Sequence, residues 1–86
     1  MSSRKKLLER FLRFPKDFTW DELNRLLNGY GYYQSNKGKT SGSRVVFEND
    51  DSNIALNLHK PHPKNTLKPY HMNDVYEFLR KIEIVK

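Results

Sequence analysis

The most constraining feature of this 86-residue chain is segment 53–58, in which large apolar side chains alternate strictly with asparagine and alanine. The three apolar side chains face one way and the residues between them face the other, as in a half-buried β-strand. The β-forming residues of 43–48 precede this segment, and only the turn 49–52 separates the two. Parallel strands need a crossover connection of a dozen or more residues. The two segments therefore predict an antiparallel hairpin.

Three helices and one further strand are expected around this hairpin. Apolar residues at helical spacing predict helices over 3–13, 19–28 and 70–81, and the short aromatic segment 30–34 predicts a first strand. The order α-α-β-β-β-α belongs to the α+β class. We expect a three-stranded antiparallel sheet with the helices packed on one of its faces.

The second helix has the clearest predicted boundaries. Thr19 and Glu22 have the spacing of a capping box, in which each side chain bonds the backbone amide of the other residue. Trp20 begins the apolar face of this helix and is assigned to the core. Gly29 is expected to end the helix in the left-handed conformation.

Length and composition restrict the class of protein. A chain of this size buries only about 60% of its unfolded surface, so residues 1–86 are expected to form one domain with a thin core. The sequence has no cysteine, which removes disulfides and thiolate zinc sites. It also has no apolar run of the ~20 residues that span a bilayer, and no signal-peptide pattern. We therefore expect a soluble cytoplasmic protein without a membrane partner.

Positive charge is concentrated in two segments of the chain. There are 16 Lys and Arg against 10 Asp and Glu, but segments 23–47 and 52–73 contain no carboxylate. A localised basic face attracts polyanions such as RNA, although charge alone does not separate this interpretation from a basic surface without a ligand. The expected RNA-binding residues are six of the seven basic side chains in these segments: Lys37, Lys39, Arg44, Lys60, Lys64 and Lys68.

All three histidines lie in the lysine- and proline-rich segment 58–71. The unperturbed pKa of histidine is near 6.5, so one imidazole can take the proton of a ribose 2′-hydroxyl while a second, or water, protonates the leaving oxygen. His62 and His59 are the candidate catalytic residues. His71 is expected to pack or to cap the last helix. Passive phosphate binding and half of a zinc site are the alternatives for the pair, and cysteine is absent as a further zinc ligand.

Three short motifs stand out in this sequence: a helix ending in Leu26-Leu27-Asn28-Gly29-Tyr30-Gly31-Tyr32, Gly42-Ser43 opening a strand, and His62 five residues before Leu67-Lys68-Pro69. Taken together in order and spacing, these motifs resemble the HicA toxins of prokaryotic toxin–antitoxin pairs. The resemblance covers residues 19–81 and leaves 1–18 as an N-terminal helical extension. It implies a fold like the double-stranded-RNA-binding domain, cleavage of messenger RNA without a metal or other cofactor, and a HicB-like antitoxin as protein partner.

The chain departs from this family at Arg44, where the resemblance implies a catalytic histidine. Arginine stays protonated and cannot act as a general base, although it can hold a phosphate with two hydrogen bonds. His62, where the family also tends to carry histidine, is therefore the first catalytic candidate and His59 the second, while His71 is expected to be dispensable. Two alternatives stay open: a non-catalytic module that binds RNA or an antitoxin, and a DNA-binding regulator, which is disfavoured because no predicted helix is conspicuously basic.

Overall fold

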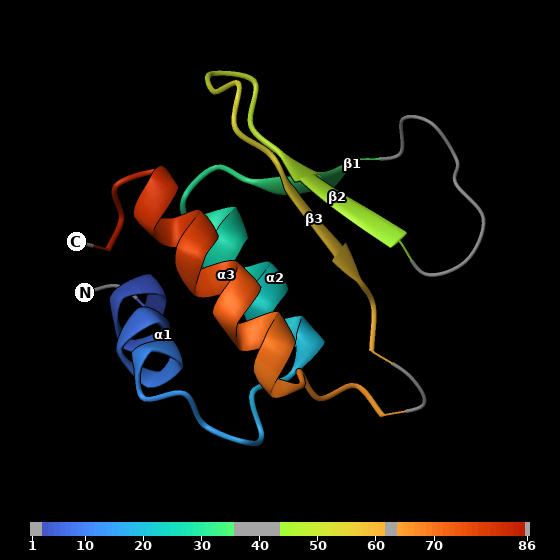
Figure 1. Cartoon of the computed structure of the whole chain (residues 1–86). Coiled ribbons are helices and arrows are strands. Elements are labelled where there is room, and N and C mark those ends of the chain that lie inside the picture. Colours follow the sequence, from blue (N-terminus) through green and yellow to red (C-terminus); the bar gives the residue numbers. More distant parts are fainter. Residues whose placement is uncertain (1–2, 36–43, 62–63, 86) are drawn as a thin grey trace.

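The computed structural model describes residues 3–35, 44–61 and 64–85. In it, helices lie on one side of a β-sheet (Figure 1). The described elements confirm the predicted α+β class and the α-α-β-β-β-α order. In chain order they are α1 (Ser3–Leu12), α2 (Trp20–Gly29), β1 (Tyr33–Ser35), β2 (Arg44–Glu48), β3 (Leu56–His59) and α3 (Pro69–Lys81).

The sheet is antiparallel throughout, in the order β1-β2-β3, so the predicted hairpin is confirmed. Strand β3 begins later than predicted because the connection from β2 is longer than four residues. In it the Ser52 hydroxyl accepts a hydrogen bond from the Ile54 amide at 3.1 Å. Strand β1 also begins later than predicted, because the Tyr30 and Gly31 amides still bond carbonyls of α2.

Cross-strand register sorts the side chains of the sheet into two faces. Val45 lies opposite Leu58 and Phe47 opposite Leu56, on the face that packs against the helices. His59 leaves with the opposite face and is exposed, as the alternation predicts.

Helices α2 and α3 lie against one face of the sheet, and α1 packs behind them (Figure 1). This arrangement confirms that the helices lie on one side. The core includes Trp20, as predicted, and consists of apolar side chains from all three helices, from β2 and β3, and from the segments between elements. Its buried members are Phe11, Phe18, Trp20, Leu23, Leu26, Leu27, Tyr32, Phe47, Leu56, Leu58, Leu67, Met72, Val75, Phe78 and Leu79.

The capping box at the start of α2 is confirmed. The Glu22 amide donates to Thr19 Oγ1 at 3.1 Å, and the Thr19 amide donates to Glu22 Oε1 at 2.9 Å. The prediction for Gly29 is wrong, because the helix includes this residue and the left-handed glycine is Gly31, with φ +89°. A Cβ atom at Gly31 would lie 2.9 Å from Asn49 Nδ2, so both backbone conformation and space favour glycine there.

Arg10 joins α1 to α2 through two carboxylates. Its Nε donates to Glu22 Oε2 at 2.8 Å, and its Nη2 donates to Asp17 Oδ1 at 3.1 Å. The next residue, Phe11, is completely buried. The N-terminal helix is therefore part of the packed fold. In the described ranges, no helix combines the length and apolar character that crossing a bilayer requires.

Candidate functional site

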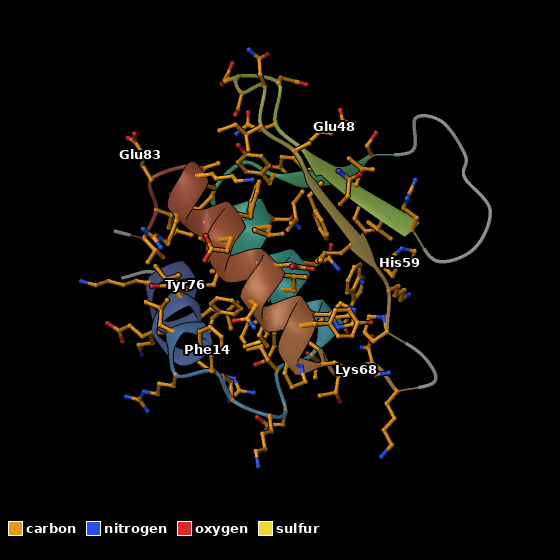
Figure 2. The ribbon with its side chains drawn as sticks, in the orientation of Figure 1. Phe14, Glu48, His59, Lys68, Tyr76 and Glu83 are labelled. Atoms are coloured by element: carbon orange, nitrogen blue, oxygen red, sulfur yellow. The ribbon has the colours of Figure 1, made fainter. Side chains whose placement is uncertain are left out.

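The outer face of the sheet, which points away from the helices, carries the exposed part of the candidate site. Figure 2 shows His59 toward one end of this sheet and Glu48 toward the other. Arg44 and Glu48 share this face and lie four residues apart on β2, which corresponds to about 13 Å along a strand. The face is therefore positive at the end that precedes the basic loop and negative at the far end. By register its members are Tyr33, Ser35, Arg44, Val46, Glu48, Asn57 and His59.

Arg44 and His59 are direct cross-strand partners. Residues directly opposite in an antiparallel pair have Cβ atoms about 4.5–5.5 Å apart and side chains on the same face. Both residues are exposed, and the Arg44 guanidinium has no ion-pair partner in the part of the chain that the structure describes. The sheet thus places a permanent cation beside an imidazole on an open surface. A guanidinium can hold a phosphate while the imidazole exchanges a proton.

His71 lies under this pair rather than in it. His71 is 1% exposed, and its ring bonds the backbone at both nitrogens. The Lys68 amide donates to Nδ1 at 3.0 Å, and Nε2 lies 2.8 Å from the carbonyl oxygen of His59. Burial lowers the pKa of His71 below its ordinary value, against the smaller opposite effects of the His59 carbonyl and Asp74. The expectation that His71 packs or caps is confirmed, whereas its bond to His59 was not predicted.

The basic loop that follows β3 is attached to the fold at its far end. The Trp20 amide donates to the Asn65 carbonyl and the Leu67 amide donates to the Phe18 carbonyl, both at 2.8 Å. Thr66 forms an isolated antiparallel bridge with Thr19. Together with the His71 bond to His59 at the near end, these bonds hold the ends of the loop to the fold and so limit the positions of its lysines.

The lysines of this loop are exposed. Lys60, Lys64 and Lys68 all face solvent, as RNA-binding residues must. An open groove of about 500 Å³ includes Lys64 and Lys68 and is completed by Lys16 from the α1–α2 connection. Sequence reasoning missed Lys16 because its neighbour Asp17 excludes it from the acid-free segments, although Asp17 is bonded to Arg10.

Three predicted site residues lie outside the described residues. They are His62, Lys37 and Lys39. Their predicted roles in catalysis and RNA binding stay predictions. Among the described residues, His59 is the candidate catalytic histidine that the structure brings beside another candidate, Arg44.

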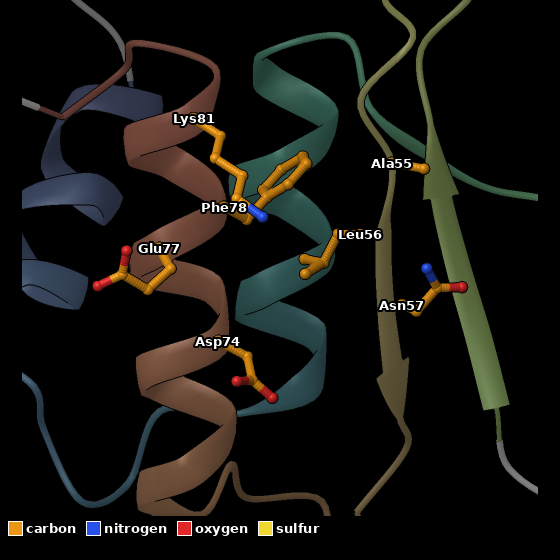
Figure 3. Close-up of a pocket in the computed structure, with 7 residues that line it drawn as sticks. All are labelled: Ala55, Leu56, Asn57, Asp74, Glu77, Phe78 and Lys81. Atoms are coloured by element: carbon orange, nitrogen blue, oxygen red, sulfur yellow. The ribbon is translucent and has the colours of Figure 1, made fainter.

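A second groove lies between β3 and α3 and has a different chemistry. Figure 3 shows Leu56 and Phe78 between the two elements, with Asp74, Glu77 and Lys81 projecting from α3. Two carboxylates against one ammonium group make this groove a poor place for a polyanion. Phosphate contacts are therefore expected at the Arg44 end of the sheet and along the basic loop. In the described ranges, His, Asp and Glu do not gather in a group of three that could hold a metal ion.

Comparison with known proteins agrees with the resemblance in the sequence. A family model described as the HicA toxin of bacterial toxin–antitoxin systems matches residues 20–84. No curated protein and no solved structure matches the chain. The matched range contains α2, the sheet and α3, and so includes every described residue of the candidate site except Lys16.

Proposed function

Because the chain belongs to the HicA toxin family, we propose that it is a toxin that binds and cleaves messenger RNA in the cytoplasm. A HicB-like antitoxin is the proposed protein partner that neutralises it. The observation that carries the catalytic part is the Arg44–His59 pair at the open end of the sheet. The family membership and the basic loop support the choice of RNA as substrate.

The proposed reaction is transfer of the phosphodiester to the neighbouring ribose 2′-hydroxyl. An imidazole takes the 2′-hydroxyl proton as the O2′–P bond forms, and a second imidazole or water protonates the 5′ oxygen as the P–O5′ bond breaks. The products are a 2′,3′-cyclic phosphate and a free 5′-hydroxyl. These side chains can supply the necessary proton transfers by themselves. We assign the two imidazole roles to His62 and His59, without ordering them.

Arg44 is proposed to stabilise the charge that develops on the phosphoryl oxygens. A guanidinium donates two parallel hydrogen bonds to such oxygens and keeps its charge throughout the reaction. The substitution at this position therefore moves the proton-transferring group to the opposite strand, where His59 stands. One β-ladder supplies both a cation and a proton acceptor.

RNA binding is assigned to the lysines of the two acid-free segments. Lys60, Lys64 and Lys68 are exposed along the loop, and Lys37 and Lys39 belong to the other acid-free segment. Neutralising phosphates releases counterions, so the affinity should fall with added salt.

A non-catalytic module is the second candidate, and Arg44 is the observation that favours it. Arginine cannot replace the base that the family resemblance implies at this position. If His59 and His62 do not take over this role, the same surface would still bind RNA or the antitoxin. Such a module would inhibit by occupancy.

Incubation of the purified protein with RNA in EDTA separates the two candidates. The toxin should cleave the RNA and leave 2′,3′-cyclic phosphate and 5′-hydroxyl ends, identified by mass spectrometry. The matched control is the doubly substituted protein His59→Ala/His62→Ala, prepared identically, which should leave the RNA intact and so exclude a contaminating nuclease. RNA that is retained by the wild-type protein but stays uncut would overturn the catalytic proposal and support the module.

A further inference from the structure

His71 is a buried titratable side chain that the proposed chemistry does not use. It is the one buried polar or charged residue in the described part of the chain, at 1% exposure. The exposed ring of Tyr70 stacks over it, with centroids 4.1 Å apart and planes tilted by 32°. A buried polar ring of this kind must satisfy both of its nitrogens.

The two hydrogen bonds fix the protonation state of the ring. A backbone amide can only donate, so Nδ1 must accept from Lys68 with a lone pair. A backbone carbonyl can only accept, so Nε2 must carry the proton and donate it to His59. Both bonds are satisfied by neutral His71 in the Nε2–H tautomer. An added proton on Nδ1 would face the Lys68 amide and remove the first bond.

The charged and titratable groups near His71 include some that favour a protonated ring and some that favour the neutral ring. Lys68 and the helix N-terminus disfavour a positive ring, as does His59 across the gap to β3. Asp74 on the next turn of α3 favours it. Burial is the largest influence, and it favours the neutral ring.

The bond to His59 connects this ring to the candidate site. His59 is the last residue of β3, and its carbonyl oxygen is held by Nε2 of His71 at 2.8 Å. The backbone at this point determines where the His59 side chain lies relative to Arg44. The ladder to β2 and the buried side chain of Leu58 also hold the strand end, and the His71 bond adds a tie from its last residue to α3.

We propose that His71 is a positioning residue, whose neutral ring ties the end of β3 to the N-terminus of α3 and so holds His59 opposite Arg44. This inference rests on the proposed function of the Arg44–His59 pair. It replaces the expectation that His71 is dispensable. It also makes the site sensitive to acid, because protonation puts a charge on a buried ring and an N–H against the Lys68 amide. The charged ring leaves its buried position, which breaks the bond to His59 as well and loosens the strand end.

Two amide substitutions separate the two bonds. In His71→Gln, the side-chain amide nitrogen can reach the position of Nε2 and keep the bond to His59. In His71→Asn, the side-chain oxygen takes the place of Nδ1 and keeps the bond to Lys68 alone. We expect His71→Asn to lower kcat for RNA cleavage by about 10- to 100-fold, since small misplacements of reacting groups have effects of this size. Its KM should stay within about two-fold. His71→Gln should stay near wild type.

Backbone ¹⁵N relaxation of His59 and Lys60 is the second measurement and does not depend on cleavage. Both amides should become more mobile in His71→Asn than in His71→Gln. In the wild-type protein they should become more mobile as pH falls from 8 to 5, a change that His71→Gln should lack. The wild-type titration decides the question even if neither variant folds.

Equal mobility and equal kcat in the two variants would overturn the inference, as would a wild-type strand end that stays rigid on acidification. If the wild-type protein cleaves no RNA, the proposed function fails, whereas the relaxation measurements still show whether His71 holds the strand end.

Discussion

Arg10 and Arg44 are chemically the same side chain in opposite surroundings. Arg10 has carboxylates at Nε and Nη2, and its guanidinium also lies 5.5 Å from the centre of the Phe18 ring. Arg44 lies beside a histidine instead of a carboxylate. The first arrangement uses the charge to join two helices. The second leaves the charge available to an anion that the described residues do not supply.

The difference extends to the residues around each arginine. At the Arg10 end, Glu22 serves both the guanidinium and the capping box of α2, so charges and backbone groups are mutually satisfied. At the Arg44 end, the neighbouring loop carries exposed lysines in an acid-free segment. An excess of one charge on an open face is typical of a binding surface, because solubility alone is served equally well by a mixture of both signs. The comparison gives Arg10 a structural role and supports the proposed role of Arg44 in binding an anion.

The largest expected effect comes from removing the imidazoles at the open end. His62→Ala and His59→Ala should each lower the rate of RNA cleavage by about 10² to 10⁴, the usual contribution of a general acid or base. His62→Ala should have the greater effect and should abolish growth arrest. Circular dichroism and RNA affinity should stay near wild type. Full toxicity of both variants in cells would show that the imidazoles do not act in this way.

Replacing each arginine with alanine in turn tests the comparison directly. Arg44→Ala should lower cleavage by about 10²- to 10³-fold, as loss of one charge-stabilising donor does, with an unchanged melting temperature. Arg10→Ala should do the reverse and lower the melting temperature while folded protein keeps its cleavage rate. Arg44→His should raise cleavage above that of Arg44→Ala. A lower melting temperature for Arg44→Ala than for Arg10→Ala would contradict the assignment.

Acid should remove the stability contributed by His71 and by the Arg10–Glu22 ion pair in two different pH ranges. The pKa of His71 is lowered by burial from an ordinary 6.5, so the stability that its neutral ring contributes is complete above about pH 6.5 and is lost as pH falls below it. The pKa of Glu22 is lowered by Arg10 from an ordinary 4.5, so its contribution is lost only below about pH 4.5.

Urea unfolding at pH 8, 5.5 and 3.5 measures both losses. His71→Gln should remove most of the change between pH 8 and 5.5, and Glu22→Gln should reduce the change between pH 5.5 and 3.5. The same pH profile in wild type and His71→Gln would exclude His71 as the source of the first loss.

The smallest expected effects concern the lysines. Lys37→Ala, Lys39→Ala, Lys60→Ala and Lys64→Ala should each weaken RNA binding and reduce the slope of log K against log salt by about 0.7 to 1, the value for one lost phosphate contact. Lys81→Ala on α3 is the control, because its side chain lines the groove that contains Asp74 and Glu77. An unchanged slope in all four of these lysine variants would place the RNA site elsewhere.

Much of the fold follows from local patterns that the sequence displays. Hydrophobic periodicity, β-forming residues and turn residues predicted the described helices and strands in order, because each of these signals is local to its segment. The boundaries were less accurate where a turn extended into a neighbouring element. The left-handed residue after α2 is Gly31 rather than Gly29, and the space beside it is limited by Asn49 of the distant hairpin connection, which the local sequence does not reveal.

The sequence predicted which residues form the candidate site but not which of them lie opposite each other. A turn over 49–52 would pair Glu48 with Asn53 and hence Arg44 with Asn57. The longer connection shifts the register by two residues and brings His59 opposite Arg44 instead. A shift of two keeps every side chain on its face, so alternation alone could not detect it. The bond from His71 to His59 spans 12 residues and depends on how α3 docks.

Helix α1 makes the family boundary different from the folding boundary. The family match begins at residue 20, yet the completely buried Phe11 and the partly buried Leu7 and Leu8 of α1 belong to the core. A protein shortened to residues 20–84 would expose the surface of the helical layer that α1 covers, and exposed apolar patches promote association. Such a fragment should aggregate although it holds nearly the whole candidate site. The part of the chain that the family model matches is thus shorter than the part expected to stay soluble on its own.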